Sequence, residues 1–369
     1  MKITAEITGI KYSPKLIPEL KKFNFDDFDI NELPSYCLVE YEDFSFGLSK
    51  WLSPKRTRSY PYERIYNTLG SSKRITVIPI IKDEGKNGDR DFIQWDTVSL
   101  MSLLDVYVIF AYYYSAEKHS TKPNKITNQV LDNSLVKKKI EELKNYHSSA
   151  LHWNLSEIEK SFPDLIRKVK SSYGKIGKRL NVKFHSEEGI DKFAEQFING
   201  VKSFMQTSRT KAREAQAREV LTEQPKEALA RSTKAIITIE NYLGGKYYFT
   251  TDEIKIQGNS VFLIEAKHSK TSLLPSKSDI KDGLLKMILY SNLENVKVNE
   301  KPFSVIPVLK LTSSKLQSHI TSEENERKLE TFFIKNRFDE KNKSLVKDLL
   351  EEAQENNFQI VIEHAETKK

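Results

Sequence analysis

The sequence predicts an α/β protein of the α+β kind, in which helices flank a central mixed sheet and a mixed, helix-rich region comes first. Short apolar runs at 74–81 and 303–311 have the length and β-branched composition of buried strands. Charged segments at 133–147 and 155–180 have helical character. From residue 186 the segments follow as helix, three strands, helix, strand, helix and strand.

A chain of 369 residues is long enough for two domains with cores of their own. We expect one region at 1–185 and another at 186–369. In the first, the apolar segment 97–116 is predicted to be a core helix. In the second, Ser186 is expected to cap a helix that carries apolar residues at core spacing, namely Phe193, Phe197, Val201 and Phe204.

Composition narrows the class of protein. The net charge is +8, and residues 51–250 carry the whole excess, with 34 basic against 23 acidic side chains. Such a field suggests a polyanionic partner, although a lysine-rich soluble surface would look the same. No apolar run reaches the roughly 18–20 residues that span a bilayer, and no secretory signal is seen. The single cysteine, Cys37, fits a reducing cytoplasm.

The segment 50–66 mixes basic and aromatic side chains with two prolines. Basic groups neutralise phosphates and aromatic rings stack on bases, so this segment predicts a nucleic-acid contact. The alternative is an ordinary surface loop whose tyrosines pack into the fold. The second candidate for DNA contact is the basic region 160–218. The candidate DNA-binding residues of the two regions are Lys55, Arg56, Arg58, Arg64, Arg209 and Arg213.

The segment 246–268 is the most informative part of the chain. Two β-rich runs flank Gly258-Asn259, which is typical of a tight hairpin. With these two residues as the loop, Asp252 faces Glu265, and Lys267 returns to the same face two residues later. Glu253 would then point the other way, whereas a slip of one residue would put it opposite Glu265.

Two carboxylates facing each other on apolar strands repel, so one must be protonated or a cation must lie between them. Carboxylate oxygens are the ligands that Mg²⁺ prefers, and a bound Mg²⁺ can polarise a phosphoryl oxygen and acidify a water molecule. A neighbouring lysine can orient that water. Asp252, Glu265 and Lys267 therefore suit metal-assisted hydrolysis of a phosphodiester.

The spacing of Asp252 and Glu265-Ala266-Lys267 resembles the PD-(D/E)xK nuclease superfamily, which includes most type II restriction endonucleases. The resemblance covers about residues 205–311, with Thr251 where the motif has proline. It implies a restriction-endonuclease-like core in which Asp252 and Glu265 bind Mg²⁺ and Lys267 is catalytic. Some members add a glutamate from the preceding helix, for which Glu214 and Glu219 are both candidates.

We therefore expect a cytoplasmic, Mg²⁺-dependent type II restriction enzyme that hydrolyses double-stranded DNA at specific sites. A palindromic site favours a homodimer, and a companion DNA methyltransferase is expected in the same system. The N-terminal region would recognise the DNA. The alternatives are a repair, recombination or phage-defence nuclease of the same fold, or a non-catalytic DNA-binding protein with a degenerate site.

Overall fold

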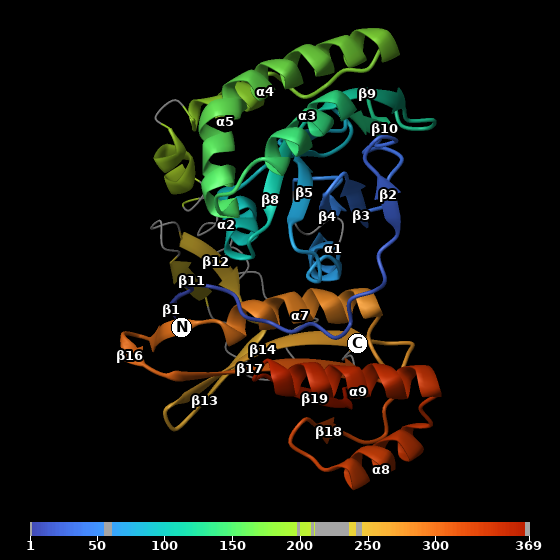
Figure 1. Cartoon of the computed structure of the whole chain (residues 1–369), viewed down its shortest axis with the longest axis vertical. Coiled ribbons are helices and arrows are strands. Elements are labelled where there is room, and N and C mark those ends of the chain that lie inside the picture. The colour runs from blue at the N-terminus through green and yellow to red at the C-terminus, as the bar shows by residue number, and fades with distance from the viewer. Residues whose placement is uncertain are drawn as a thin grey trace. The chain divides into compact units, whose positions relative to one another are not determined.

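The chain forms two compact units in the computed structural model (Figure 1). The central unit contains residues 19–210, and the terminal unit combines residues 1–18 with 211–369. Both contain mixed sheets and helices, so the α+β class is confirmed. The residues that the structure describes are 2–54, 61–197, 200–207, 210, 236–240 and 246–365.

The central unit is built on a five-stranded sheet with the order β2-β3-β4-β5-β8. Buried side chains from its strands and from the following helices form one apolar core. Its elements are β2 (Lys22–Asn24), β3 (Tyr36–Tyr41), β4 (Phe44–Lys50), α1 (Pro61–Asn67), β5 (Arg74–Pro79), β6 (Ile81–Asp83), β7 (Arg90–Phe92), α2 (Trp95–Leu103), β8 (Tyr107–Ala111), β9 (Tyr113–Lys118), β10 (Ile126–Leu131), α3 (Asn133–Lys144), α4 (Ala150–Leu180) and α5 (Glu188–Glu195).

The prediction of one core helix over 97–116 is wrong. The helix α2 ends at Leu103, Asp105 takes a positive φ of 53°, and the chain continues as the strands β8 and β9. β8 lies parallel to β5, and all five of its residues are buried. An apolar run buried on both faces has no alternation that distinguishes a strand from a core helix. The β-branched and aromatic residues after Asp105 favour the strand.

The helices predicted after residue 130 are confirmed as α3 and α4. Ser149 caps α4 by accepting a hydrogen bond from the backbone N–H of His152 at 3.3 Å. Pro163 lies inside this helix without ending it. The predicted cap of the next helix is wrong, because α5 begins after Glu187 and no side chain caps it. Ser186 instead accepts a hydrogen bond from Arg90 through its backbone oxygen.

The terminal unit contains two five-stranded sheets, ordered β12-β11-β1-β15-β16 and β13-β14-β17-β19-β18. The three strands predicted in succession are therefore divided between two sheets. The division falls at residues 251–252, which lie outside any strand. The elements are β1 (Lys2–Glu6), β11 (Ile236–Glu240), β12 (Lys246–Thr250), β13 (Glu253–Gln257), β14 (Ser260–Ser269), α7 (Lys277–Ser291), β15 (Glu294–Val298), β16 (Lys301–Pro302), β17 (Ser304–Ser313), β18 (Ile320–Thr321), α8 (Glu326–Asn336), α9 (Glu340–Glu355) and β19 (Gln359–His364).

The unit boundaries differ from the expected division after residue 185. β1 pairs in parallel with β11 and antiparallel with β15, which joins the first residues of the chain to its second half. The paired segments are more than 200 residues apart, so no local sequence pattern predicts the pairing. Among the described residues, no helix combines the length and the apolar character that a membrane span requires.

The sheet that contains β14 has one face that is almost completely buried. β14 and β17 run parallel, with Glu265 beside Leu309, and β19 continues the sheet with Ile360 beside Leu309. Gly283 brings α7 against this face, because a Cβ atom there would lie 2.7 Å from the Leu309 Cδ1 atom. The alternating residues that form the face are each at most 2% exposed: Val261, Leu263, Glu265, Leu309, Leu311, Ile360 and Ile362.

Candidate active site

The predicted hairpin register is confirmed. Gln257 pairs with Ser260 and Glu253 with Ile264, so Gly258 and Asn259 are the two loop residues. Gly258 has a φ of +59°, which glycine adopts without strain. Asp252 lies one residue before β13, and its Oδ2 atom accepts the backbone N–H of Ala266 at 2.9 Å. This bond holds the Asp252 carboxylate beside the part of β14 that carries the Glu-x-Lys motif.

Glu265 is a charged residue in an apolar face. Its side chain is 2% exposed, yet both carboxylate oxygens have cationic partners. Lys267 Nζ lies 3.0 Å from Oε1, and Lys286 Nζ lies 2.6 Å from Oε2. A buried carboxylate is stable only when such partners replace its water, so these two lysines are what permits the charge here.

The helix α7 supplies two of the residues at this site, Asp282 and Lys286. They stand four residues apart and therefore lie on one side of the helix. Asp282 Oδ2 accepts from Lys267 Nζ at 2.7 Å, so Lys267 bridges Glu265 and Asp282. Neither residue is among those predicted from the sequence. The available signal was the lysine at 286 inside the otherwise apolar stretch 284–290 of a predicted helix.

The charges at the site do not cancel. Three carboxylates, Asp252, Glu265 and Asp282, stand against two ammonium groups, Lys267 and Lys286, which leaves one net negative charge when all are ionised. Burial raises the pKa of the Glu265 carboxyl and the Asp252 charge acts in the same direction, whereas Lys286 and Lys267 oppose them. The ionised state of Glu265 therefore depends on the cations beside it.

The two lysines respond in the opposite sense. Burial by itself lowers the pKa of an ammonium group, but the charges of Glu265 and Asp282 outweigh burial and raise the pKa of Lys267. The charges of Glu265 and Asp252 likewise outweigh burial and raise the pKa of Lys286. Both side chains are therefore positively charged throughout the neutral range.

The residues fit a Mg²⁺ ion by their chemistry. Asp252 and Glu265 offer two carboxylates, and Mg²⁺ is commonly held by one or two carboxylates together with waters and substrate phosphates. The net negative charge favours a cation. Each carboxylate oxygen has two lone pairs. The hydrogen bonds that the two lysines donate therefore leave acceptor sites on Glu265 for a metal. In the described part of the chain, no three His, Cys, Asp or Glu side chains are grouped closely enough to hold a metal by themselves.

Two details near the hairpin refine the prediction. His268 lies on the other face of the sheet, where its Nδ1 atom is 2.9 Å from the Thr312 hydroxyl. Ile256, which alternation along β13 would place on the same face as Ile254, is 42% exposed near the hairpin tip. The apolar surroundings of the site therefore end before Ile256 and are formed by Ile254, Val261 and Leu263.

The expected DNA-binding residues are only partly placed by the structure. Arg64 is described: it lies on α1, half-buried, and its guanidinium donates to the backbone oxygen of Lys50. Lys50, Trp51 and Tyr66, which belong to the same predicted contact segment, are buried and present no surface to DNA. Lys55, Arg56, Arg58, Arg209 and Arg213, and the acidic candidates Glu214 and Glu219, lie outside the described residues.

Comparisons of the chain with protein-family models, with curated proteins and with solved structures gave no match.

Proposed function

We propose that this chain is a Mg²⁺-dependent endonuclease that hydrolyses double-stranded DNA, with a restriction-endonuclease-like site in its terminal unit. One observation carries the proposal: the buried Glu265 carboxylate lies between two lysines and beside Asp252. A structural ion pair needs only one lysine beside the carboxylate. The second lysine and the second carboxylate favour a site that binds charged ligands, namely a metal ion and a phosphodiester.

Asp252 and Glu265 are the residues that would hold the metal. When bound, Mg²⁺ supplies a Lewis acid for a phosphoryl oxygen and lowers the pKa of a bound water. Lys267 is fixed by Glu265 on one side and Asp282 on the other, so its ammonium group has a defined position from which to hydrogen-bond the attacking water or the phosphate. Lys286 offsets the negative charge that a phosphodiester would bring to this site.

The restriction type is the more specific part of the proposal. The central unit adds 192 residues that are not needed for the hydrolytic site and could recognise DNA. Several basic side chains of α4 are exposed, including Lys168, Lys175 and Lys178, which suits phosphate contacts. In this proposal the enzyme is a cytoplasmic homodimer that works beside a DNA methyltransferase and cuts a palindromic sequence.

A cleavage assay tests the proposal. Phage DNA and a supercoiled plasmid are incubated with the protein in Mg²⁺ or in EDTA, and the products are separated by size. Discrete fragments that require Mg²⁺ support a restriction enzyme, a smear or a preference for branched DNA supports a repair or recombination nuclease, and binding without cleavage overturns the enzymatic proposal.

Variants test the site within the same assay. We expect Asp252→Asn and Lys267→Met to lose at least about 100-fold in rate, the scale on which single electrostatic contacts act in hydrolases. Glu253→Gln is the matched control, because Glu253 is the adjacent acid that pairs with Ile264 and faces the other way. Full activity of Asp252→Asn, or a loss in Glu253→Gln equal to it, contradicts the residue assignment.

A further inference from the structure

The central unit contains a cavity of about 290 Å³ between α4 and the segment that follows it. This volume is close to the lower end of the range of ligand pockets, roughly 300–1,000 Å³. The wall includes Val182, Phe184 and Ile190 as apolar residues, and exposed residues such as Lys178 and Glu187 show that the cavity opens to solvent.

A histidine is held in a fixed orientation at this cavity. His185 Nδ1 lies 2.9 Å from Asp83 Oδ1, and Asp83 is only 2% exposed. The same carboxylate accepts the backbone N–H of Gly85 at 2.8 Å, and Arg90 lies 3.9 Å from its other oxygen. Because Nδ1 faces the carboxylate, Nε2 is the ring atom left for a ligand.

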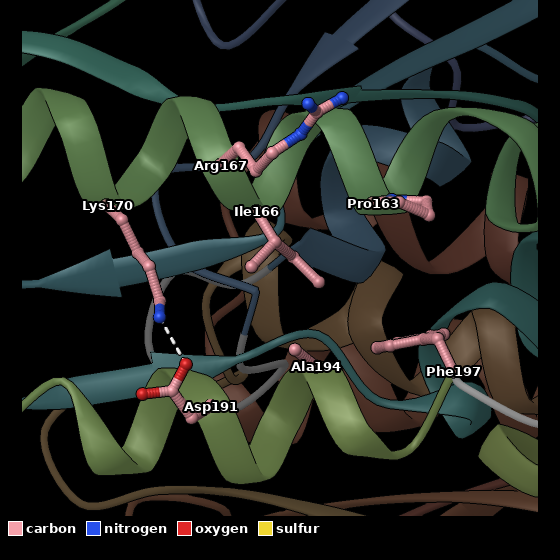
Figure 2. A pocket seen from close by; sticks show the side chains of 7 residues that line it. All are labelled: Pro163, Ile166, Arg167, Lys170, Asp191, Ala194 and Phe197. Atoms are coloured by element: carbon pink, nitrogen blue, oxygen red, sulfur yellow. Dashed lines mark hydrogen bonds and ion pairs between the residues drawn. The ribbon is translucent and has the colours of Figure 1, made fainter.

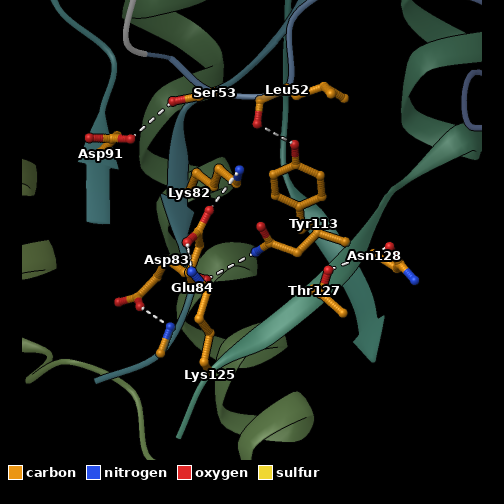
Figure 3. A network of polar contacts seen from close by, with 12 residues as sticks. Leu52, Ser53, Lys82, Asp83, Glu84, Asp91, Tyr113, Lys125, Thr127 and Asn128 are labelled. Carbon is orange, nitrogen blue, oxygen red and sulfur yellow. Dashed lines mark hydrogen bonds and ion pairs between the residues drawn. The ribbon is translucent and has the colours of Figure 1, made fainter. Parts of the chain in front are cut away.

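The acidic neighbour of Asp83 does not compete for this histidine. Glu84 is held by two lysines, with Lys82 Nζ and Lys125 Nζ each 3.0 Å from its carboxylate (Figure 3). The segment carrying His185 is fixed as well, since Arg90 Nη1 donates to the Ser186 backbone oxygen at 2.8 Å. The Asp83–His185 pair is therefore formed before any ligand arrives, which lowers the cost of binding.

Two glycines lie in the part of α4 that lines the cavity. Glycine inside a helix is unfavourable, so each position needs a reason. Gly177 has one in the packing: a Cβ atom there would lie 3.0 Å from the Val182 backbone oxygen and 3.2 Å from the Phe184 ring. Gly174 has none, because a Cβ atom would meet nothing within 4 Å. Its missing side chain instead keeps the wall of the cavity open.

Cations stand at the mouth of this cavity. Lys178 is exposed, and no ion pair is found for it among the residues that the structure describes. Lys170 of α4 pairs with Asp191 of α5. The same pair lines a second cavity, whose apolar wall includes Pro163, Ile166 and Phe197 (Figure 2). Arg167, Lys170 and Asp191 are the charged residues of this second lining, whose described residues include no histidine.

We propose that the cavity at His185 binds a nucleoside monophosphate unit, either as a free mononucleotide or as a nucleotide extruded from a DNA strand. The planar base lies in the space beside Gly174 and against the Phe184 ring. The Phe184 ring itself packs on Tyr173, with 4.9 Å between the two ring centroids. His185 Nε2 bonds the polar edge of the base, and Lys178 contacts the phosphate. The proposal concerns the central unit alone and stands whether or not the terminal unit cleaves DNA.

Calorimetric titration of the full chain with each of the four deoxynucleoside 5′-monophosphates tests the free form. Inorganic phosphate and the deoxynucleosides are the matched controls. We expect at least one monophosphate to bind with a Kd below about 1 mM, and its nucleoside to bind about tenfold more weakly. The extruded form is tested with duplexes containing 2-aminopurine, whose fluorescence rises when the base leaves the stack. No binding in either arm, or equal affinity for phosphate alone, overturns the proposal.

Substitutions separate loss of the site from loss of the fold. Gly174→Leu fills the open space with a better helix former, so we expect the ligand to be lost while the melting temperature stays equal or rises. Ser171→Leu, on the exposed side of the same helix, is the control and should bind as the parent does. Binding that survives Gly174→Leu refutes the proposed position. Asp252→Asn should leave this binding unchanged, which distinguishes failure here from failure of the nuclease proposal.

Discussion

Replacing Lys286 by Met removes one of the two cations that hold Glu265. Lys286 Nζ lies 2.6 Å from Oε2, and water cannot easily replace it because Glu265 is 2% exposed. Removing one partner of a buried ion pair costs about 3–5 kcal/mol. Glu265 keeps Lys267 at 3.0 Å, so we expect the lower end, about 3 kcal/mol. Methionine is unbranched like lysine and similar to it in helix propensity, so a change in helix propensity does not account for the loss.

The measurement is urea unfolding followed by far-UV circular dichroism, in EDTA at neutral pH. A melting curve should show a decrease of roughly 6–12 °C, at about 2–4 °C per kcal/mol for a unit of this size. Lys277→Met, in the exposed first turn of the same helix, should change stability by less than about 0.5 kcal/mol. In a double-mutant cycle of Lys286→Met with Glu265→Gln, we expect an interaction free energy above about 1 kcal/mol. Additive effects, or a Lys286→Met loss no larger than the control, would refute the proposed coupling.

Two further predictions concern packing and pH. Gly283→Ala should destabilise the fold by about 1–3 kcal/mol, because its Cβ atom would lie 2.7 Å from Leu309 Cδ1. Gly174→Ala should stabilise the fold by up to about 1 kcal/mol, because its Cβ atom meets nothing within 4 Å. Changes of the same sign in the free energy of unfolding by urea would contradict this pair of predictions. Burial raises the pKa of the Cys37 thiol to about 12 from 9.0, so its contribution to stability is complete below pH 9 and is lost as the pH rises toward 12. Cys37→Ala should therefore lose less stability than the parent between pH 9 and 11, and native Cys37 should resist iodoacetamide at pH 8.

The part of the site that could be predicted is the part encoded locally. The Gly258-Asn259 turn fixes the register of β13 and β14, because a two-residue loop determines which residues pair. From that register, the common face of Glu265 and Lys267 follows without knowledge of the rest of the fold. The bond from Asp252 to the Ala266 N–H also depends only on the hairpin.

The rest of the site depends on packing between distant segments. Lys286 reaches Glu265 because α7 crosses β14 at close range where Gly283 carries no side chain. Helical periodicity predicted α7, but periodicity does not say which strand a helix covers. The parallel pairing of β1 with β11 could not be predicted from the sequence for the same reason. Both partners are ordinary short strands, and most of the chain separates them.

If Glu265 binds Mg²⁺ as proposed, its surroundings must also keep the carboxylate ionised within an apolar sheet when no metal is bound. Lys267 and Lys286 supply the cations that make ionised Glu265 tolerable in the metal-free protein. If Mg²⁺ takes the place of Lys286 at Oε2, then the stability lost in Lys286→Met should shrink as Mg²⁺ is added, because the metal restores the missing charge and binds only the folded state. If Lys286 keeps its bond when the metal is present, the loss should be the same in Mg²⁺ as in EDTA. The difference between these two losses thus measures the exchange of one cation for another, independently of cleavage.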